Sequence, residues 1–391
     1  MDSLAAVARE NTSQQRDRDL RLDVCRGIAL WFIFLDHVPG NIGSWFTLSH
    51  YGFSDTTELF MFVSGVTCAL AYGEVHRHDG WFAVFSHTLR RSWEIYVAFL
   101  ALTIACVVMV YLVADAQLAD ETNTQIVLER PGPALAHALT LKFRPVNTDV
   151  LPTFVLFHLS FAPLLWVLMK SPNLTLGAAL LLYLLVQTFG WNLPQWPRNE
   201  WYFNPLAWQF LVVLGAWWVA IGRKSWQSLL ISPVVTAFAA LYLLFAFLVA
   251  LSWSIKPLAD MMPQILAKLI YPIDKSDLDP LRLLHFLAIA LLVARLVGPD
   301  WRGLTTPVLR SAVRCGENSL EIYLRGCAAV ACSPCRAGEG LRRPGDADRA
   351  EPGRGGGHDR DRNPFDKDQD CKPRRAETVL RVVVELVVVP V

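Results

Sequence analysis

The sequence predicts an all-α, polytopic transmembrane helix bundle of about nine to ten spanning helices, with the last one lost or altered. Of the 391 residues, 53% are hydrophobic, only 18% are charged, and 14 are Trp. Such a chain is more apolar and more aromatic than ordinary soluble domains. The net charge of +1 gives no reason to expect nucleic acid as a partner.

Nine mostly apolar windows have about the length that crosses a bilayer. They are residues 26–40, 56–73, 92–114, 150–169, 174–191, 203–221, 229–252, 281–298 and 308–326. The first and the last of these windows are the least apolar. We therefore expect a cytoplasmic N-terminal segment over residues 1–18 and a transmembrane domain over residues 19–326.

Basic residues gather in alternate loops, which predicts the orientation of the chain. Clusters of Arg and Lys precede the first window and follow the second, the sixth and the eighth. Short cytoplasmic loops carry an excess of these residues. The loops at 39–55, 115–149, 192–202 and 253–280 are therefore expected on the outer side, and the N-terminus is expected in the cytoplasm.

The composition changes abruptly at the C-terminal end. Residues 327–391 are rich in Arg, Gly, Asp and Pro, and such a segment cannot bury enough apolar area to fold. A native disordered tail is one interpretation. A shifted reading frame is the other, and it is favoured because the helical character of CGENSLEIYL (Cys315–Leu324) breaks off within a few residues.

The first apolar window carries the densest set of ionisable residues, which are expensive inside a membrane. Asp23 and Arg26 are three positions apart at the cytoplasmic end, where they fit an anchoring ion pair or a functional pair. Asp36 and His37 lie at the outer end. A neutral His37 suits a general base, and the alternative is a histidine satisfied by a carbonyl or by water. Adjacent helical residues point about 100° apart, so Asp36 is not expected to orient His37 directly.

The second window begins with two carboxylates at the same level as His37. Glu58 is the deeper one and is the expected partner of His37, whereas Asp55 is expected to cap the helix. Further along, Ser64 and Gly65 predict close packing against another helix, because small residues let helices approach.

Arg90 and Arg91 lie at the cytoplasmic entry of the third window. They fit the basic anchoring of a membrane helix or a site for an anionic group such as phosphates, which guanidinium groups bind well. His158 and His285 are lone histidines on apolar faces and are interpreted as satisfied core residues. The sequence contains no set of residues with metal-ligand spacing, and we predict no metal site.

The outer loop WNLPQWPRNEWYFNPLAWQF (Trp191–Phe210) is crowded with aromatic residues. An interfacial aromatic belt explains most of them. Stacking on sugar rings is the alternative, and the candidates for sugar contact are Trp196, Trp201, Asn204 and Gln209.

Several of these stretches together resemble a known family. LRLDVCRGIALWFIFLDH, in which ten residues separate Arg26 from His37, resembles the first-helix pattern of the membrane acyltransferase-3 superfamily. FMFVSGVTCALAYG, RRSWEIY, LPTFVLFHLSFAPLLW, NPLAWQFLVVLGAW and GENSLEIY are similar to the OpgC family, the succinyl-transfer proteins of osmoregulated periplasmic glucans. The resemblance covers roughly residues 18–325.

The resemblance implies a multi-pass enzyme of the bacterial inner membrane, surrounded by membrane lipid. It implies transfer of an acyl group, succinyl in that family, from cytoplasmic acyl-CoA to hydroxyl groups of a periplasmic glucan, with no bound cofactor. His37 would be the catalytic histidine with Arg26 as its partner, and Arg90 and Arg91 would bind the donor. One departure concerns the donor site, because Glu94 stands where members of the acyltransferase-3 superfamily often carry a further basic residue, three positions after the second Arg.

Two alternatives to an enzyme remain open on the sequence. A transporter or flippase for a glycan or lipid would also use buried histidines and carboxylates, although the two halves of the chain show no repeat. A non-catalytic partner that binds glucan through the Trp-rich loop is the other alternative.

Overall fold

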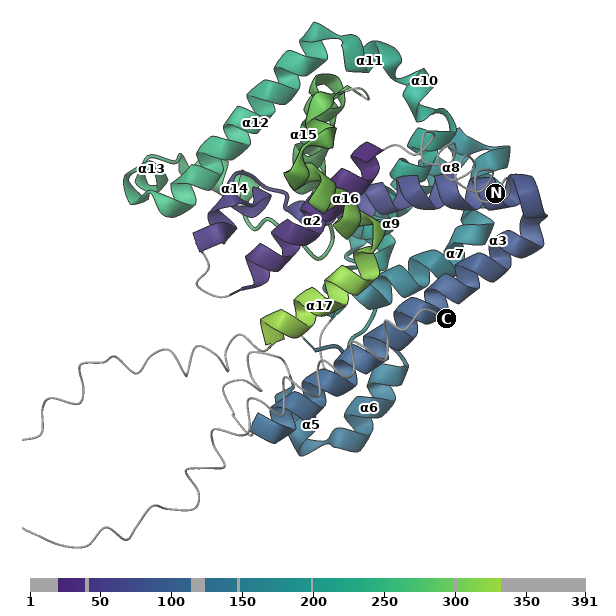
Figure 1. Cartoon of the computed structure of the whole chain (residues 1–391). Coiled ribbons are helices and arrows are strands. Elements are labelled where there is room, and N and C mark those ends of the chain that lie inside the picture. The colour runs from purple at the N-terminus through teal and green to yellow at the C-terminus, as the bar shows by residue number, and fades with distance from the viewer. Residues whose placement is uncertain are drawn as a thin grey trace, which may run out of the picture.

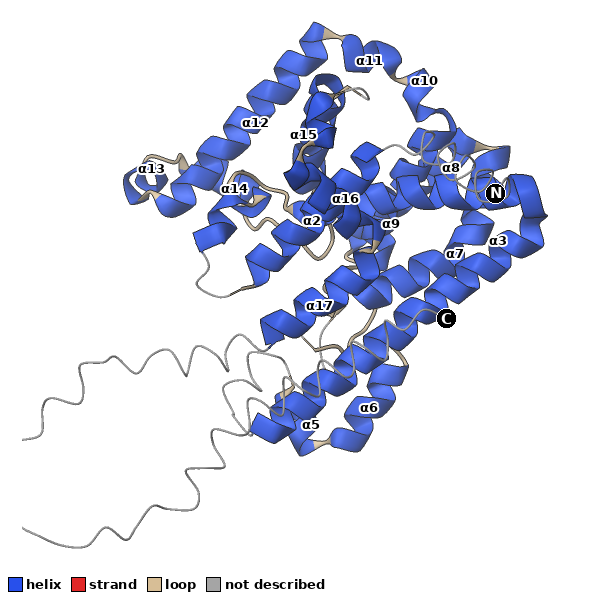
Figure 2. Ribbon diagram, viewed as in Figure 1, coloured by secondary structure: helices blue, strands red, loops and turns tan. Residues whose placement is uncertain are grey.

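The computed structural model describes residues 20–38, 42–113, 124–145, 148–197, 200–298 and 301–331. The segments expected at the two ends, residues 1–18 and almost all of 327–391, lie outside this described part. Within it the chain is almost entirely helical and forms no strand beyond an isolated bridge between Pro194 and Glu200 (Figure 2). The predicted all-α class is thus confirmed.

Nine helices of more than ten residues organise the described chain (Figure 1). They are α2 (Leu20–His37), α3 (Thr56–Val113), α7 (Val150–Lys170), α8 (Pro172–Phe189), α9 (Pro205–Trp217), α12 (Pro233–Ser254), α15 (Pro280–Leu296), α16 (Pro307–Glu317) and α17 (Ser319–Ala331). Shorter helical pieces connect them: η1 (Ile42–Phe46), η2 (Leu48–His50), α5 (Gln125–Glu129), α6 (Pro131–Leu139), η3 (Trp218–Gly222), α10 (Arg223–Ser225), α11 (Gln227–Ile231), α13 (Lys256–Asp260), α14 (Gln264–Ile270) and η4 (Arg302–Thr305).

Five helical stretches of the described chain are long and apolar enough to cross a membrane. They are Thr56–Val108, Val150–Lys170, Pro172–Phe189, Pro205–Gly222 and Pro233–Ser254. Each one overlaps a window expected from the sequence, which supports a membrane protein. The number of nine to ten spans stays a prediction.

The second and third expected windows belong to α3, which consists of two helical legs joined at a kink. The polar stretch between them, expected as a loop, is also helical, and there Glu74 forms ion pairs with Arg77 and His78. The direction changes at Gly80, whose φ of 79° lies in the left-handed region that glycine adopts without strain. The two legs of α3 therefore form a V (Figure 1).

Glycines allow two pairs of helices to touch through their backbones. A side chain at Gly27 of α2 would overlap the Ala312 carbonyl of α16, and one at Gly316 of α16 would overlap the Asp23 carbonyl of α2. This contact holds α2 against the C-terminal part of the chain, which shapes the site described below.

Close backbone contacts at glycines also join α3 to α9. A side chain at Gly65 would overlap the carbonyl of Val212, and one at Gly215 would overlap the carbonyl of Phe62. The close packing predicted at Gly65 is confirmed. Around this contact, α3, α7, α8 and α9 build the main apolar core, in which Trp208 is fully buried.

Candidate active site

Two cavities lie along α2, and we name them inner and outer after the predicted orientation. The inner cavity, of about 430 Å³, is bounded by α2, both legs of α3, α7, α16 and α17. The outer cavity, of about 670 Å³, is bounded by the end of α2, by η1 and η2, by the start of α3 and by Lys275. Arg26 lines the inner cavity, whereas Asp36 and His37 line the outer one.

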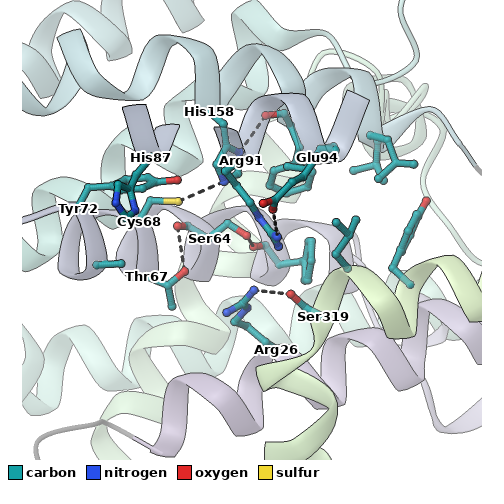
Figure 3. Close-up of a pocket in the computed structure, with 18 of the residues that line it drawn as sticks. Arg26, Ser64, Thr67, Cys68, Tyr72, His87, Arg91, Glu94, His158 and Ser319 are labelled. Carbon is teal, nitrogen blue, oxygen red and sulfur yellow. Dashed lines mark hydrogen bonds and ion pairs between the residues drawn. The ribbon is translucent and has the colours of Figure 1, made fainter. Parts of the chain in front are cut away.

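Arg26 connects the first helix to the last described one. Its Nη2 donates a hydrogen bond to the Ser319 hydroxyl at 2.5 Å (Figure 3). Asp23 is buried, with 3% of its surface exposed, where α2 crosses α16. The stretch GENSLEIY (Gly316–Tyr323) forms one wall of the inner cavity. Its lining residues are Glu317, Ser319, Leu320 and Tyr323.

Arg90 and Arg91 both line the inner cavity, and a single carboxylate holds them. Arg90 Nε donates to Glu94 Oε1 at 3.1 Å, and Arg91 Nη1 donates to Glu94 Oε2 at 2.9 Å. Their side chains are 62% and 37% exposed. Glu94, which also lines the inner cavity, therefore holds both guanidinium groups.

His158 also lines the inner cavity, next to a thiol. Its Nδ1 lies 3.0 Å from the carbonyl oxygen of Phe154, and a carbonyl only accepts, so the neutral ring carries its proton on Nδ1. Its Nε2 therefore keeps a lone pair, which faces Cys68 Sγ at 3.7 Å (Figure 3). No pattern in the sequence indicated this pair, because the two residues are ninety positions apart on different helices.

His37 lines the outer cavity with an exposed side chain. Its Nδ1 lies 2.6 Å from the carbonyl oxygen of Ile33, which assigns the proton to Nδ1 and leaves the Nε2 lone pair available to take a proton. Nδ1 of His37 is thus satisfied by a carbonyl, as one of the two interpretations from the sequence expected. Nε2 remains suited to the other interpretation, a general base.

Asp36 makes its contacts away from His37, as expected. Its Oδ1 accepts hydrogen bonds from the hydroxyls of Thr47 at 2.5 Å and Ser49 at 3.0 Å. Asp36 therefore fixes the segment of η1 and η2 to the end of α2.

The prediction that Glu58 is the partner of His37 is wrong. Glu58 is fully buried and accepts a hydrogen bond at 2.8 Å from Nε of Arg282, at the start of α15. It also accepts from the backbone N–H of Asp55 at 3.1 Å. A buried carboxylate needs a cation, and Arg282 is far away in the sequence, so the pattern of the second window alone could not reveal the partner.

Asp55 caps α3, as predicted, by accepting a hydrogen bond from the Thr57 N–H at 2.7 Å. It also forms ion pairs with Lys275 at 2.5 Å and with Arg282 at 3.1 Å. Burial alone would raise the pKa of Asp55, but these two cations outweigh burial and hold that pKa well below its usual range. Asp55, Glu58, Lys275 and Arg282 form a charge-balanced cluster beside the outer cavity.

The candidates for sugar contact are mostly engaged inside the protein. Asn204 is fully buried, caps α9 and donates to the carbonyl of Trp191 and to Asp277, each at 2.7 Å. Gln209 donates to the carbonyl of Ala179 at 2.9 Å. The structure gives these two amides intramolecular roles and does not support sugar contact by them.

The two tryptophan candidates also pack against protein groups. Trp201 is 5% exposed and lies under the guanidinium of Arg144, which is 4.3 Å from its ring centroid. Trp196 is half-buried and stacks on His137 with the ring centroids 4.7 Å apart. Trp201 is therefore too buried for a sugar platform, and sugar contact at Trp196 stays a prediction.

His285, interpreted as a core histidine, is buried and lies with its Nδ1 2.7 Å from the Ser54 hydroxyl. That interpretation is confirmed. The described residues contain no cluster of three or more His, Cys, Asp or Glu that could hold a metal ion.

Comparison with known proteins gives one family. No curated protein and no solved structure matches the chain. The profile of the family described as OpgC protein matches residues 18–335, which is most of the sequence. The match includes α2, both cavities and the residues that line them, and the chain therefore belongs to the OpgC family.

Proposed function

We propose that this protein is an inner-membrane O-acyltransferase that moves an acyl group, succinyl in the first instance, from cytoplasmic acyl-CoA to hydroxyl groups of osmoregulated periplasmic glucans. Membership of the OpgC family supports a role in glucan modification. The spacing of Arg26 and His37, which resembles that of the acyltransferase-3 superfamily, supports acyl transfer.

The observation that carries this proposal is the position of α2 between the two cavities. Arg26 lines the inner cavity together with Arg90 and Arg91, and His37 lines the outer one. Guanidinium groups match the phosphates of a nucleotide-bearing donor. An exposed imidazole in a polar cavity suits an acceptor that carries hydroxyl groups. The donor would therefore enter from the N-terminal side of α2, and the acceptor from the opposite side.

The proposed reaction is a direct attack of the glucan hydroxyl on the thioester. Nε2 of His37 takes the proton as the hydroxyl oxygen bonds to the thioester carbonyl carbon. The tetrahedral intermediate then collapses, the C–S bond breaks, and the proton on His37 goes to the departing CoA thiolate. Arg26 and His37 are about 16 Å apart along the helix axis, so the thioester must travel through the bundle on an extended arm such as the pantetheine of CoA.

Expression in a bacterial host whose periplasmic glucans carry no acyl groups tests this function. We expect the chain to produce glucans with added negative charge and the mass of the acyl group, measured by ion exchange and mass spectrometry. His37→Ala should reduce acylation at least 100-fold, in the range of a lost general base. His78→Ala, an exposed histidine that lines neither cavity, is the control. Unmodified glucans with the wild type, or full modification with His37→Ala, would refute the proposal.

A glycan or lipid transporter is the second candidate. The buried cluster of Asp55, Glu58, Lys275 and Arg282 favours it, because buried carboxylates paired with cations also serve proton-coupled transport. Transport predicts that expression changes the amount of glycan on each side of the membrane without changing its mass. The same mass measurement therefore separates the two functions.

A further inference from the structure

The outer cavity combines a polar lining with one large aromatic wall. The polar side chains carry hydroxyl groups, carboxylates, imidazoles and one ammonium group. They are Asp36, His37, Ser44, Ser49, His50, Asp55, Thr56, Thr57 and Lys275, and the aromatic wall is Trp45. A sugar ring needs this combination, because its hydroxyl groups require hydrogen-bond partners and its C–H faces pack on an aromatic ring.

Trp45 presents its ring to the cavity instead of burying it. Trp45 is 52% exposed and lines the outer cavity. It is stacked on His50, with the ring centroids 5.0 Å apart and the planes 30° apart. His50 therefore supports one face of the indole, and the exposed remainder can accept a ligand.

A series of contacts fixes Trp45 and His50 to α2, the helix that carries His37. Asp36 accepts from the Ser49 hydroxyl, and Ser49 Oγ lies 3.1 Å from Nδ1 of His50, the residue under Trp45. The Tyr51 hydroxyl donates to the backbone carbonyl of Trp45 at 2.5 Å. The residue next to His37 thus sets the position of the indole.

The charges of the cavity favour a neutral ligand. Asp55 and Lys275 neutralise each other at 2.5 Å, and the Asp36 carboxylate is engaged by two hydroxyls. No excess positive charge remains among the described lining residues to attract an anionic group. An unsubstituted sugar with its hydroxyl groups fits this lining better than a phosphorylated or carboxylated one.

We infer that Trp45 is the stacking platform of the acceptor subsite, on which a neutral pyranose ring of the glucan lies within reach of His37, and that Asp36 is a positioning residue that holds this platform. The inference rests on the proposed function, and it moves the sugar contact from the Trp-rich loop to residues 44–50. A membrane-interface tryptophan with no ligand is the alternative that the experiment must separate.

The test measures glucan acylation and glucan binding separately, with the full chain in lipid nanodiscs and purified unsubstituted periplasmic glucan as the probe. Trp45→Ala should raise KM for glucan about tenfold, equivalent to about 1.4 kcal/mol, and leave KM for acyl-CoA unchanged. Trp45→Tyr should restore most of the wild-type value, because a stacking ring remains. Asp36→Asn should raise KM for glucan more than it lowers kcat.

The matched control is Trp191→Ala, which removes a tryptophan of similar exposure, 49%, that does not line the outer cavity. It should leave KM for glucan unchanged. Equal KM values for Trp45→Ala and wild type, or an equal loss in Trp191→Ala, would overturn the inference while leaving acyl transfer standing.

Binding of glucan without acyl-CoA, measured by calorimetry, distinguishes the two failures. Wild-type binding that Trp45→Ala weakens about tenfold, together with no acyl transfer, would refute the enzyme and support the subsite. Binding that Trp45→Ala leaves intact would refute the subsite whether or not the chain transfers acyl groups.

Discussion

Arg26 and His37 lie on the same helix, α2, and line two different cavities. Ten residues separate them, and this step is about three helical turns, so the two side chains lie on nearly the same face of α2, about 16 Å apart along its axis. The Arg26 end is held by Ser319 of α17. The other end is joined through Asp36 to the segment of η1 and η2. One helix therefore links the proposed donor side to the proposed acceptor side.

Glu94 should compete with the donor for Arg90 and Arg91, because it holds both guanidinium groups. We expect Glu94→Gln to lower KM for acyl-CoA severalfold and Arg91→Ala to raise it about tenfold, the order of one lost charge-assisted hydrogen bond. Steady-state kinetics measure both effects. Neither variant should change KM for acyl-pantetheine, which lacks the nucleotide phosphates, and an equal effect on both donors would contradict phosphate binding. Arg77→Ala, whose side chain pairs with Glu74 outside the cavity, is the control.

Cys68 should be dispensable if transfer is direct. Its thiol faces Nε2 of His158 in the inner cavity, which is the arrangement that a thioester relay would use. Direct transfer predicts that Cys68→Ala retains acylation within about threefold and that no acyl group remains on the protein after incubation with acyl-CoA alone. Mass spectrometry of the intact chain checks this. A hydroxylamine-sensitive adduct on Cys68, lost together with activity in Cys68→Ala, would replace direct transfer with a relay.

Arg282 should be the most important charge for stability beside the outer cavity. Its side chain is 9% exposed and neutralises the fully buried Glu58. Arg282→Met would leave that carboxylate buried without its cation, at a cost of about 3–5 kcal/mol. The midpoint of thermal unfolding in detergent should fall clearly. The surface pair of Arg325 with Glu321 offers the comparison, since Arg325 is 59% exposed and Arg325→Ala should change the midpoint little. Equal midpoints for the two variants would contradict the role of the buried cluster.

The crossing of α2 and α16 should tolerate no side chain at its two glycines. Gly27→Leu and Gly316→Leu each place atoms on a carbonyl of the opposite helix, and we expect each to reduce the yield of folded protein in size-exclusion chromatography. Gly73→Leu serves as the control, because a Cβ at Gly73 meets no atom within 4 Å. A normal yield of the Gly27 and Gly316 variants would show that the two helices do not pack this closely.

The local patterns in the sequence predicted the helices and the contacts between near neighbours. Apolar windows located the long helices, Gly65 indicated a close crossing, and Asp55 was recognised as a cap. These local patterns did not predict the partner of a polar group when that partner lies far away in the sequence. Glu58 was assigned to His37 because both lie at the outer end of a helix, but its cation comes from α15, more than 200 positions away.

The Trp-rich loop shows the same limit for the candidate site. Its amides and rings resemble a sugar-binding set in the sequence, but tertiary packing uses Asn204, Gln209 and Trp201 to hold the loop against the bundle. Trp45 gave no comparable signal, because it is a lone tryptophan in a short connection. Only the folded chain shows that it shares a cavity with His37.

If donor and acceptor meet from opposite ends of α2, acyl transfer must depend on the side of the membrane to which each substrate is added. The full chain is reconstituted in liposomes, and an N-terminal protease-cleavable tag selects those in which the N-terminus faces outward. We expect acylated glucan when acyl-CoA is added outside and glucan is enclosed inside, and none when the two are exchanged. Acyl transfer with both substrates on the same side, at the same rate, would contradict it.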